Sequence, residues 1–325
     1  MQKRIDVLGV GISAVDDLKY IAEYPPIDSK VAVTASTRQG GGPACTAIAA
    51  VGVLGGRALY AARFGENDLA RYIRAALASR GVDLSAIVDD PAGGPYHSTI
   101  VVDAAGHRNV FYDPSLYRIV QASDLPNATI ESARIFLLDH ITEPSLLPVA
   151  EKVRRLGVPI LADIEGRTES AMPLAQLADY LVVPRSFATW ATGESNANAA
   201  CATLARTQRL ATVVTDGSAG CHACIGAEPT ARHFPAFPVQ AFDTTGCGDT
   251  FHGAFALAVA RGIEVEDVIV FASAAAALKA MAAGGQRRGW EALPTRNEVM
   301  DFLRSELSEP QKSLLLNKLQ AVLCA

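Results

Sequence analysis

The chain has little of several features that mark other classes of protein. Only 19% of its 325 residues are charged and 6% are aromatic, and the formal net charge of −5 leaves no basic surplus to neutralise nucleic-acid phosphates. No apolar run reaches the roughly 18 residues of a membrane span, and the run Ile5–Val10 is too short for a signal peptide. We therefore expect a cytoplasmic protein that binds neither nucleic acid nor a membrane.

Motifs for metal binding and nucleophilic chemistry are scarce as well. The six cysteines are scattered, and the pair Cys221 and Cys224 lacks a second C-x-x-C to complete a zinc site. In a strand these two side chains would point to opposite faces, so we expect ordinary buried cysteines. The chain has neither the G-x-x-x-x-G-K-S/T loop of P-loop kinases nor the G-x-S-x-G elbow of many hydrolases. We expect His252 to pack rather than to react.

What the chain does have is an alternation of short apolar strands and helices. Strands that are apolar on both faces are typical of a parallel sheet covered by helices on both sides. The sequence therefore predicts a single doubly wound α/β domain over residues 1–325. The predicted strands are Ile5–Val10, Ala58–Phe64, Ile135–Asp139, Pro159–Asp163, Tyr180–Val183 and Thr212–Thr215. The predicted helices are Pro43–Leu54, Leu69–Arg80, Leu146–Leu156, Asn196–Gln208, an alanine-rich helix near Glu266–Ala283, and a tail over Thr295–Leu323 broken near Pro310.

Two segments break this rhythm and predict a small β appendage. Lys30–Thr37 alternates between apolar and polar residues, and His97–Val102 with Asn109–Tyr112 is typical of a hairpin around Ala105-Gly106. The appendage would be built from two separate inserts, at about residues 12–38 and 95–114.

The segment Asp243–Asp249 (D-T-T-G-C-G-D) carries the most chemical information. Glycines and small residues precede a long apolar helix, and the free N–H groups of a helix N-terminus attract an anion such as phosphate. Asp249 places a proton acceptor in the same turn. An anion site with a base beside it is what phosphoryl transfer to a hydroxyl requires, although a plain glycine turn with a helix cap would have a similar sequence.

This segment is similar to the D-T-x-G-A-G-D signature of the ribokinase and phosphofructokinase B family of carbohydrate kinases, with Cys247 in place of the usual Ala. The resemblance implies that Asp249 is the general base, and that ATP with Mg²⁺ is the phosphoryl donor. It implies an anion hole formed by the backbone of Gly246, Cys247 and Gly248. In many relatives a monovalent cation such as K⁺ lies nearby, and Asp243 and Thr245 match the residues that shape its site.

The stretch Gly40-Gly41-Gly42-Pro43-Ala44 opens a helix and resembles the family's N-terminal G-G-x-x-x-N-x-A signature. Cys45 replaces the usual Asn, which implies a substrate other than ribose. The stretch G-G-G-P-A-C-T-A, residues 40–47, most resembles the branch of the family that contains sulfofructose kinase. Asp16 aligns with an aspartate that grips sugar hydroxyls. The implied substrate-binding residues are Asp16, Gly41, Gly42 and Cys45.

A rival interpretation comes from Gly9–Ala14, which matches the dinucleotide fingerprint G-x-G-x-x-A. That fingerprint must open a helix of about a dozen residues. Here Leu18–Glu23 is cut off by Tyr24-Pro25-Pro26, so the required helix does not fit.

Further residues match the family's nucleotide side. The turn Thr215–Gly220 resembles its T-x-G-x-x-G motif, and Gly284-Gly285 lies where relatives line the adenine pocket. The implied nucleotide-binding residues are Thr215, Gly217, Gly220, Ser273 and Gly285. The family's N-x-x-E motif is missing, since the chain has Pro184–Phe187 there, and Asp163 and Glu165 are candidates to support the metal instead.

Together these features predict an ATP-dependent kinase of a sugar or sugar derivative. The resemblance implies that the β appendage is a lid over the sugar and that the protein is a homodimer joined through this lid. Two alternatives stay open: a nucleoside or vitamin-precursor kinase on the same fold, and a catalytically silent sugar-binding protein. Candidate specificity residues are Lys30, Arg38, Tyr96, Arg108 and Tyr112.

Overall fold

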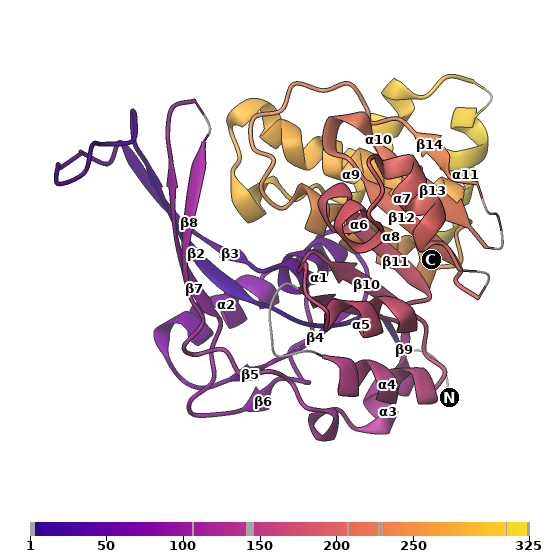
Figure 1. Ribbon diagram of the computed structural model, residues 1–325, viewed down its shortest axis with the longest axis horizontal. Helices are drawn as coiled ribbons and strands as arrows, with labels where there is room; N and C mark the ends of the chain where they lie inside the picture. Colours follow the sequence, from indigo (N-terminus) through magenta and orange to yellow (C-terminus); the bar gives the residue numbers. More distant parts are fainter. Residues whose placement is uncertain are drawn as a thin grey trace.

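An eight-stranded sheet runs through the molecule in the order β14-β13-β12-β11-β10-β9-β1-β4 (Figure 1). The strands from β12 to β4 are mutually parallel, and β13 and β14 join one edge by antiparallel pairing. The predicted parallel sheet is therefore confirmed. Its strands are β1 (Ile5–Val10), β4 (Ala58–Ala61), β9 (Ala133–His140), β10 (Ile160–Ile164), β11 (Tyr180–Pro184), β12 (Ala211–Thr215), β13 (Cys221–Ile225) and β14 (Arg232–Phe234).

The computed structural model describes residues 4–105, 107–140, 146–206, 208–226, 228, 230–309 and 311–323. Two positions on which the sequence analysis relied, the hairpin glycine Gly106 and the tail proline Pro310, lie outside these residues.

Helices cover both faces of the sheet, because alternate strand residues enter two separate cores. Val7 belongs to one core, whereas its neighbour Leu8 belongs to the other. Cys221 and Cys224 are likewise buried in opposite cores, as predicted. The first core includes residues of α1 (Pro43–Val53), α2 (Asp68–Ala78), α8 (Cys247–Ala260), α9 (Val265–Gly285), α10 (Arg296–Glu306) and α11 (Gln311–Leu323). The second includes residues of α3 (Asn127–Ser132), α4 (Leu147–Arg155), α5 (Ala171–Leu177), α6 (Arg185–Thr192) and α7 (Ala197–Leu204).

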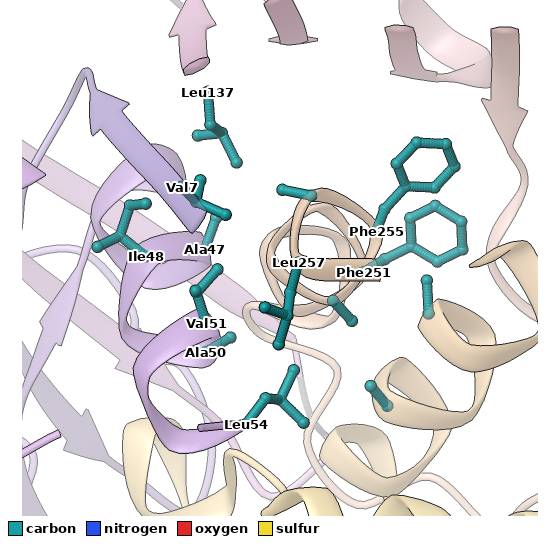
Figure 2. Close-up of a cluster of buried hydrophobic side chains, with 14 of the residues drawn as sticks. Val7, Ala47, Ile48, Ala50, Val51, Leu54, Leu137, Phe251, Phe255 and Leu257 are labelled. Atoms are coloured by element: carbon teal, nitrogen blue, oxygen red, sulfur yellow. The ribbon is translucent and has the colours of Figure 1, made fainter. Parts of the chain in front are cut away.

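Helices α1 and α8 pack against each other at the centre of the first core, where Val51 and Leu54 face Leu257 (Figure 2). Their backbones approach closely at Gly253, because a Cβ there would lie 2.2 Å from the carbonyl oxygen of Ala47. This contact holds the N-termini of both helices in fixed relation, and both N-termini belong to the candidate site.

Helix α9 is long and apolar enough, by length and composition alone, to cross a membrane. The core helix of a globular domain meets the same test. Here α9 contributes Phe271 and Ala275 to the first core and packs along α8. We therefore treat it as a core helix.

The predicted appendage is a separate four-stranded sheet that projects from the body at one side (Figure 1). Its order is β3-β2-β7-β8, with β2 (Ala14–Tyr20), β3 (Ala35–Gly41), β7 (Tyr96–Val102) and β8 (Arg108–Asp113). We call this sheet the lid. The hairpin β7–β8 was predicted, but the strand placed at Lys30–Thr37 was wrong by several residues. Pairing with β2, from Ala14 opposite Gly41 to Tyr20 opposite Ala35, fixes the limits of β3.

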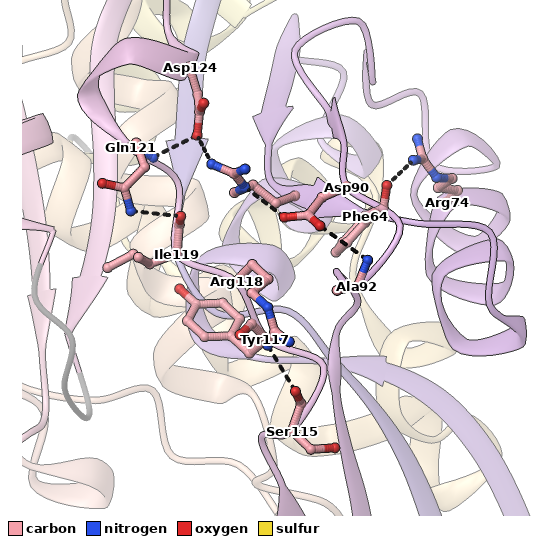
Figure 3. A network of polar contacts seen from close by, with 11 residues as sticks. Phe64, Arg74, Asp90, Ala92, Ser115, Tyr117, Arg118, Ile119, Gln121 and Asp124 are labelled. Carbon is pink, nitrogen blue, oxygen red and sulfur yellow. Dashed lines mark hydrogen bonds and ion pairs between the residues drawn. The ribbon is translucent and has the colours of Figure 1, made fainter.

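The strand predicted at Ala58–Phe64 is in fact divided. Only β4 stays in the main sheet, and Arg63–Phe64 forms β5, which pairs with β6 (Val88–Asp89). Arg63 donates to the carboxylates of Asp90 and Asp124, at 3.0 Å each. Both aspartates are labelled in the polar network of Figure 3. These ion pairs tie β5 to the segments that carry Asp90 and Asp124, away from the main sheet.

Candidate active site

The candidate site lies at the carboxyl ends of β1, β9 and β10, where α1 and α8 begin. In an open α/β sheet, ligands bind outside the carboxyl ends of the strands. Asp139 and Asp163 stand near the ends of β9 and β10, and Asp249 occupies the first turn of α8. The structure thus brings together carboxylates that lie up to 110 residues apart in the sequence.

The loop before α8 has the geometry that an anion site requires. Gly246 caps the helix in the left-handed region (φ 76°), which glycine adopts without strain. A Cβ added at Gly248 would meet nothing within 4 Å, so open space faces this residue. The first amides of a helix lack intrahelical partners and can bind an anion. The amide of Cys247 is partly engaged, because it donates to Thr244 over a long 3.3 Å.

Three carboxylates meet beside this loop. One carboxylate oxygen from each of Asp163, Glu165 and Asp249 lies within 4.8 Å of the others. Asp163 is 1% exposed, and neither of its oxygens has a hydrogen-bond partner among the described residues. Buried carboxylate oxygens without partners fit a hard divalent cation such as Mg²⁺, which prefers oxygen ligands. Asp163 and Glu165 lie at the end of β10 beside Asp249, and their predicted role in supporting a metal stays a prediction.

Burial and mutual repulsion both act on this cluster. Burial raises the pKa of Asp163 well above its ordinary value, and the neighbouring Glu165 and Asp139 carboxylates add to the shift. Burial likewise raises the pKa of Asp249, with further contributions from Asp163 and Glu165. A carboxyl group with a raised pKa is a better proton acceptor once it is ionised.

His252 joins α8 to the sheet. Its ring nitrogens lie 2.7 Å from the carbonyl oxygen of Gly248 and 3.0 Å from that of Val182, and Nδ1 is 3.4 Å from the Asp163 carboxylate. These backbone contacts agree with the predicted packing role. They also place the imidazole directly beneath the acidic cluster.

Asp139 is a buried carboxylate of the candidate site whose contacts the sequence analysis did not foresee. Its carboxylate accepts hydrogen bonds from the amides of Ile12 and Ala44, both at 2.9 Å, and so ties the end of β1 to the start of α1. Burial raises its pKa to about 7 against the opposing effect of these amides. The available signal was a lone aspartate near the end of an otherwise apolar strand.

The residues predicted to bind the sugar lie where β2 and β3 meet the start of α1. Asp16 is 8% exposed, and a Cβ on Gly41 would lie 2.1 Å from its Oδ2 atom, so a larger residue at position 41 would displace this carboxylate. Burial raises the pKa of Asp16, against hydrogen bonds from Ser98 and Gln39. Gly42 has φ 86° and packs on the carbonyl of Ile12.

Cys45, in the first turn of α1, is wholly buried and has hydrogen-bond contact with Tyr60. Its thiol therefore contacts protein in this structure, and its predicted contact with a sugar stays a prediction.

Several candidate specificity residues already have partners. Arg38 is ion-paired with Asp17 at 2.7 Å, and Tyr96 stacks on Tyr112 with ring centroids 5.9 Å apart. Arg108, at the start of β8, donates to the Thr245 hydroxyl at 2.9 Å. The lid thus touches the loop before α8 across 137 residues of sequence.

The predicted nucleotide residues lie on two elements. Thr215, Gly217 and Gly220 share the turn between β12 and β13, and Gly220 has φ 90° with its Cα packed on the Phe234 carbonyl. Gly285 lies at the end of α9 against the ring of the exposed Phe242, and Ser273 is half-buried within α9. Their role in nucleotide binding stays a prediction.

Asp243 and Thr245 are in contact, because the Thr245 amide donates to Asp243 at 3.0 Å. The same carboxylate also faces the ammonium of Lys279, a residue that the sequence analysis missed. A single lysine in an otherwise apolar helix was the available signal.

Comparison with known proteins agrees with this architecture. The model of the pfkB family carbohydrate kinases matches residues 7–292. Fructokinase from Klebsiella pneumoniae is 30% identical over 244 residues, covering 69% of this chain and 78% of that protein. Ribokinase from Bacillus subtilis (strain 168) is 41% identical over 90 residues, a match that covers 28% of this chain and spans 29% of that protein.

Two solved structures show the same fold. A suspected ribokinase from Agrobacterium tumefaciens has a TM-score of 0.82 at 30% identity, covering 92% of this chain and 97% of that one. Arabidopsis thaliana ribokinase complexed with ribose and ATP has a TM-score of 0.78 at 23% identity, covering 93% and 99%. At 23% identity, the similarity to the Arabidopsis thaliana structure shows a shared fold only.

Proposed function

Since the chain belongs to the pfkB family of carbohydrate kinases, and is thus a sugar kinase, we propose that it transfers the γ-phosphoryl group of ATP to a hydroxyl of a sugar or sugar derivative with Asp249 as the base. The observation that carries the proposal is the position of Asp249. Its carboxylate stands in the first turn of α8, beside a glycine-capped helix N-terminus and within reach of Asp163 and Glu165. Base and anion site are therefore parts of one turn.

In this proposal Asp249 accepts the proton of the attacking hydroxyl. The amides of Gly246, Cys247 and Gly248 and the N-terminal dipole of α8 stabilise the charge on the transferred group. Asp163 and Glu165 would hold Mg²⁺, which neutralises charge on the nucleotide phosphates when it is bound. The raised pKa of Asp163 is consistent with a carboxylate that needs a cation to remain ionised.

The sugar is proposed to lie between Asp249 and the lid. Asp16 would accept hydrogen bonds from two hydroxyls, and Gly41 lets the sugar approach the strand backbone. The contact from Arg108 to Thr245 couples the lid to the catalytic loop, so that closure can exclude water from the transferred phosphoryl group. Exclusion of water is what prevents simple hydrolysis of ATP.

The lid also supports the proposed homodimer. Large apolar side chains are exposed on strand β8, namely Phe111 (60%), Tyr112 (56%) and Val110 (50%), and Ile27 (92%) is exposed in the connection between β2 and β3. Exposed apolar patches of this kind mark protein–protein contacts, and a second lid offers a surface of the same chemistry. We expect the protein to act in the cytoplasm.

The test is an ADP-release screen with purified protein, MgATP, and a panel of sugars, sugar acids, sugar phosphates and nucleosides. The names of the relatives make fructose and ribose the first neutral candidates, and the resemblance to the sulfofructose kinase branch adds anionic ketoses. We expect sugar-dependent ADP release that is absent from Asp249→Asn. Turnover of a nucleoside alone would favour the nucleoside-kinase alternative. Sugar binding without ADP release would favour the silent sugar-binding protein.

A further inference from the structure

Lys279 is buried in a place where a charge is costly. It lies in α9 among alanines, is 1% exposed, and is the only lysine among the buried residues of the described ranges. Its Nζ atom lies 3.4 Å from Oδ2 of Asp243. Removing an ammonium group from water costs free energy unless the charge is paired, so a buried lysine needs a partner of opposite charge.

The carboxylate of Asp243 connects three segments of the chain. It accepts hydrogen bonds from the amides of Thr245 (3.0 Å) and Gly289 (3.2 Å) as well as the contact from Lys279. The amide of Asp243 in turn donates to Ala280, one residue beyond the lysine. Burial alone would raise the pKa of Asp243, but the Lys279 charge and the two amides outweigh it and keep the pKa below the ordinary value.

The lysine also lies under the proposed anion hole. A Cβ on Gly246 would be 3.9 Å from Lys279 Cε and 3.8 Å from an Asp249 carboxylate oxygen. The lysine side chain, the N-cap of α8 and the proposed base therefore share one small volume. A fixed positive charge so close to a helix N-terminus adds to the attraction for a phosphoryl group.

This arrangement does not fit the monovalent-cation site that the family resemblance implied. The two Asp243 oxygens already receive an ammonium and two amides, whereas a bound K⁺ would need the same oxygens as ligands. We propose that Lys279 is a tethered cation: its ammonium holds Asp243 and the loop Asp243–Asp249 in place of a monovalent ion, and the kinase therefore needs no added K⁺. Lys279 is therefore a positioning residue, and its expected effect on the kinase rate rests on the proposed function.

The experiment compares four proteins: the unmodified chain, Lys279→Met, Asp243→Asn and the double variant. Each is measured in KCl, NaCl and choline chloride at about 0.1 M, so that ionic strength and screening stay constant. One readout is sugar-dependent ADP release. The other is the unfolding temperature without substrates, which reports cation binding even if no sugar is turned over.

We expect the unmodified protein to work equally well, within about twofold, in all three salts, because surface screening is the same in each. Lys279→Met should lose about tenfold or more in choline, the scale of a lost charge-stabilising group. It should recover in KCl, where its unfolding temperature should also rise. The double variant has no free Asp243 carboxylate and should show no K⁺ effect.

Two results would overturn the proposal. One is a rate or unfolding temperature of the unmodified protein that rises specifically in KCl, which needs no variant to observe. The other is a folded Lys279→Met whose rate and unfolding temperature are the same in KCl and choline. If no sugar is phosphorylated, the proposed function fails and the ADP-release measurement is lost. The unfolding temperatures in the three salts would still decide whether Lys279 replaces an ion.

Discussion

Asp6 and Asp163 are both fully buried aspartates in strands of the same parallel sheet, one near the amino end of β1 and the other near the carboxyl end of β10. Asp6 is surrounded by arginines: Arg57 and Arg261 lie 2.8 Å from its oxygens and Arg134 lies 3.5 Å away. Asp163 has no hydrogen-bond partner in the described part of the chain and faces two more carboxylates.

The pKa values of the two residues differ accordingly. Burial on its own would raise the pKa of Asp6, but the arginines lower it to about 2, whereas burial and neighbouring carboxylates raise the pKa of Asp163. Helix α8 joins the two ends, because Asp249 lies in its first turn and Arg261 follows its last residue. The comparison indicates that charge is balanced where the sheet needs stability and left unbalanced where a ligand is to be bound.

The largest expected effect comes from a substitution in the acidic cluster at the carboxyl ends of the strands. Asp249→Asn removes the proposed proton acceptor and should lower kcat by about 10²–10⁴-fold, the usual range for general acid–base catalysis. The fold should persist, because the substitution also removes one charge from a repelling cluster. The unmodified enzyme should gain rate as pH rises and Asp249 loses its proton, and the variant should lack this dependence. Near-normal turnover of Asp249→Asn would remove the residue from its role.

The matching substitution at Asp6, near the amino end of β1, should affect stability rather than turnover. Asp6→Asn removes the buried charge that Arg57, Arg134 and Arg261 share and should lower the free energy of unfolding by about 1–3 kcal/mol, less than for a wholly buried ion pair because Arg57 and Arg134 reach solvent. Turnover of the protein that remains folded should stay close to normal. Chemical denaturation and an active-site titration would measure both. A stable Asp6→Asn with impaired turnover would reverse the comparison.

Asp163→Asn probes the metal-supporting part of the cluster. It should raise the Mg²⁺ concentration for half-maximal activity by about tenfold or more, the scale seen when residues around a metal are changed. The Mg²⁺-free protein should unfold at a higher temperature, because one carboxyl of a buried, mutually repelling cluster is gone. The exposed Asp89→Asn is the matched control. An unchanged Mg²⁺ requirement with unchanged stability would argue against a metal-holding role.

Cys247→Ala should have the smallest effect. Only its backbone amide is assigned to the anion hole, and its thiol makes one long contact, 3.8 Å from the Asp243 carbonyl. We expect kcat/KM to change by no more than about twofold, as for substitutions away from structural features. A loss of more than tenfold would mean that the thiol itself takes part.

Much of this arrangement follows from local sequence. The apolar runs of β1, β9, β10, β11 and β12 predict the parallel sheet because both faces of each are buried, and the Asp243–Asp249 segment predicts the anion site because its glycines stand directly before a helix. Strand β2 was missed, since the charged residues Asp16 and Asp17 and the preceding glycines obscure its alternation.

Other features depend on contacts between distant residues. Asp139 meets the amide of Ala44 across 95 positions, and Lys279 meets Asp243 only because α9 lies beside the loop. The division of Ala58–Phe64 depends on Asp90 and Asp124, which hold Arg63 from outside the segment. The pattern of residues within one short segment does not reveal partners that lie elsewhere in the sequence.

The most direct test of the central claim is a crystal structure of the enzyme with its best sugar, Mg²⁺ and a non-transferable ATP analogue. We predict that the acceptor hydroxyl lies about 2.6–3.2 Å from an Asp249 carboxylate oxygen, the distance for proton transfer. The γ-phosphate should face the first amides of α8, and Mg²⁺ should lie on the side of Asp163 and Glu165. A nucleotide bound away from the Gly246–Gly248 turn, or another base nearer to the hydroxyl than Asp249, would contradict the account.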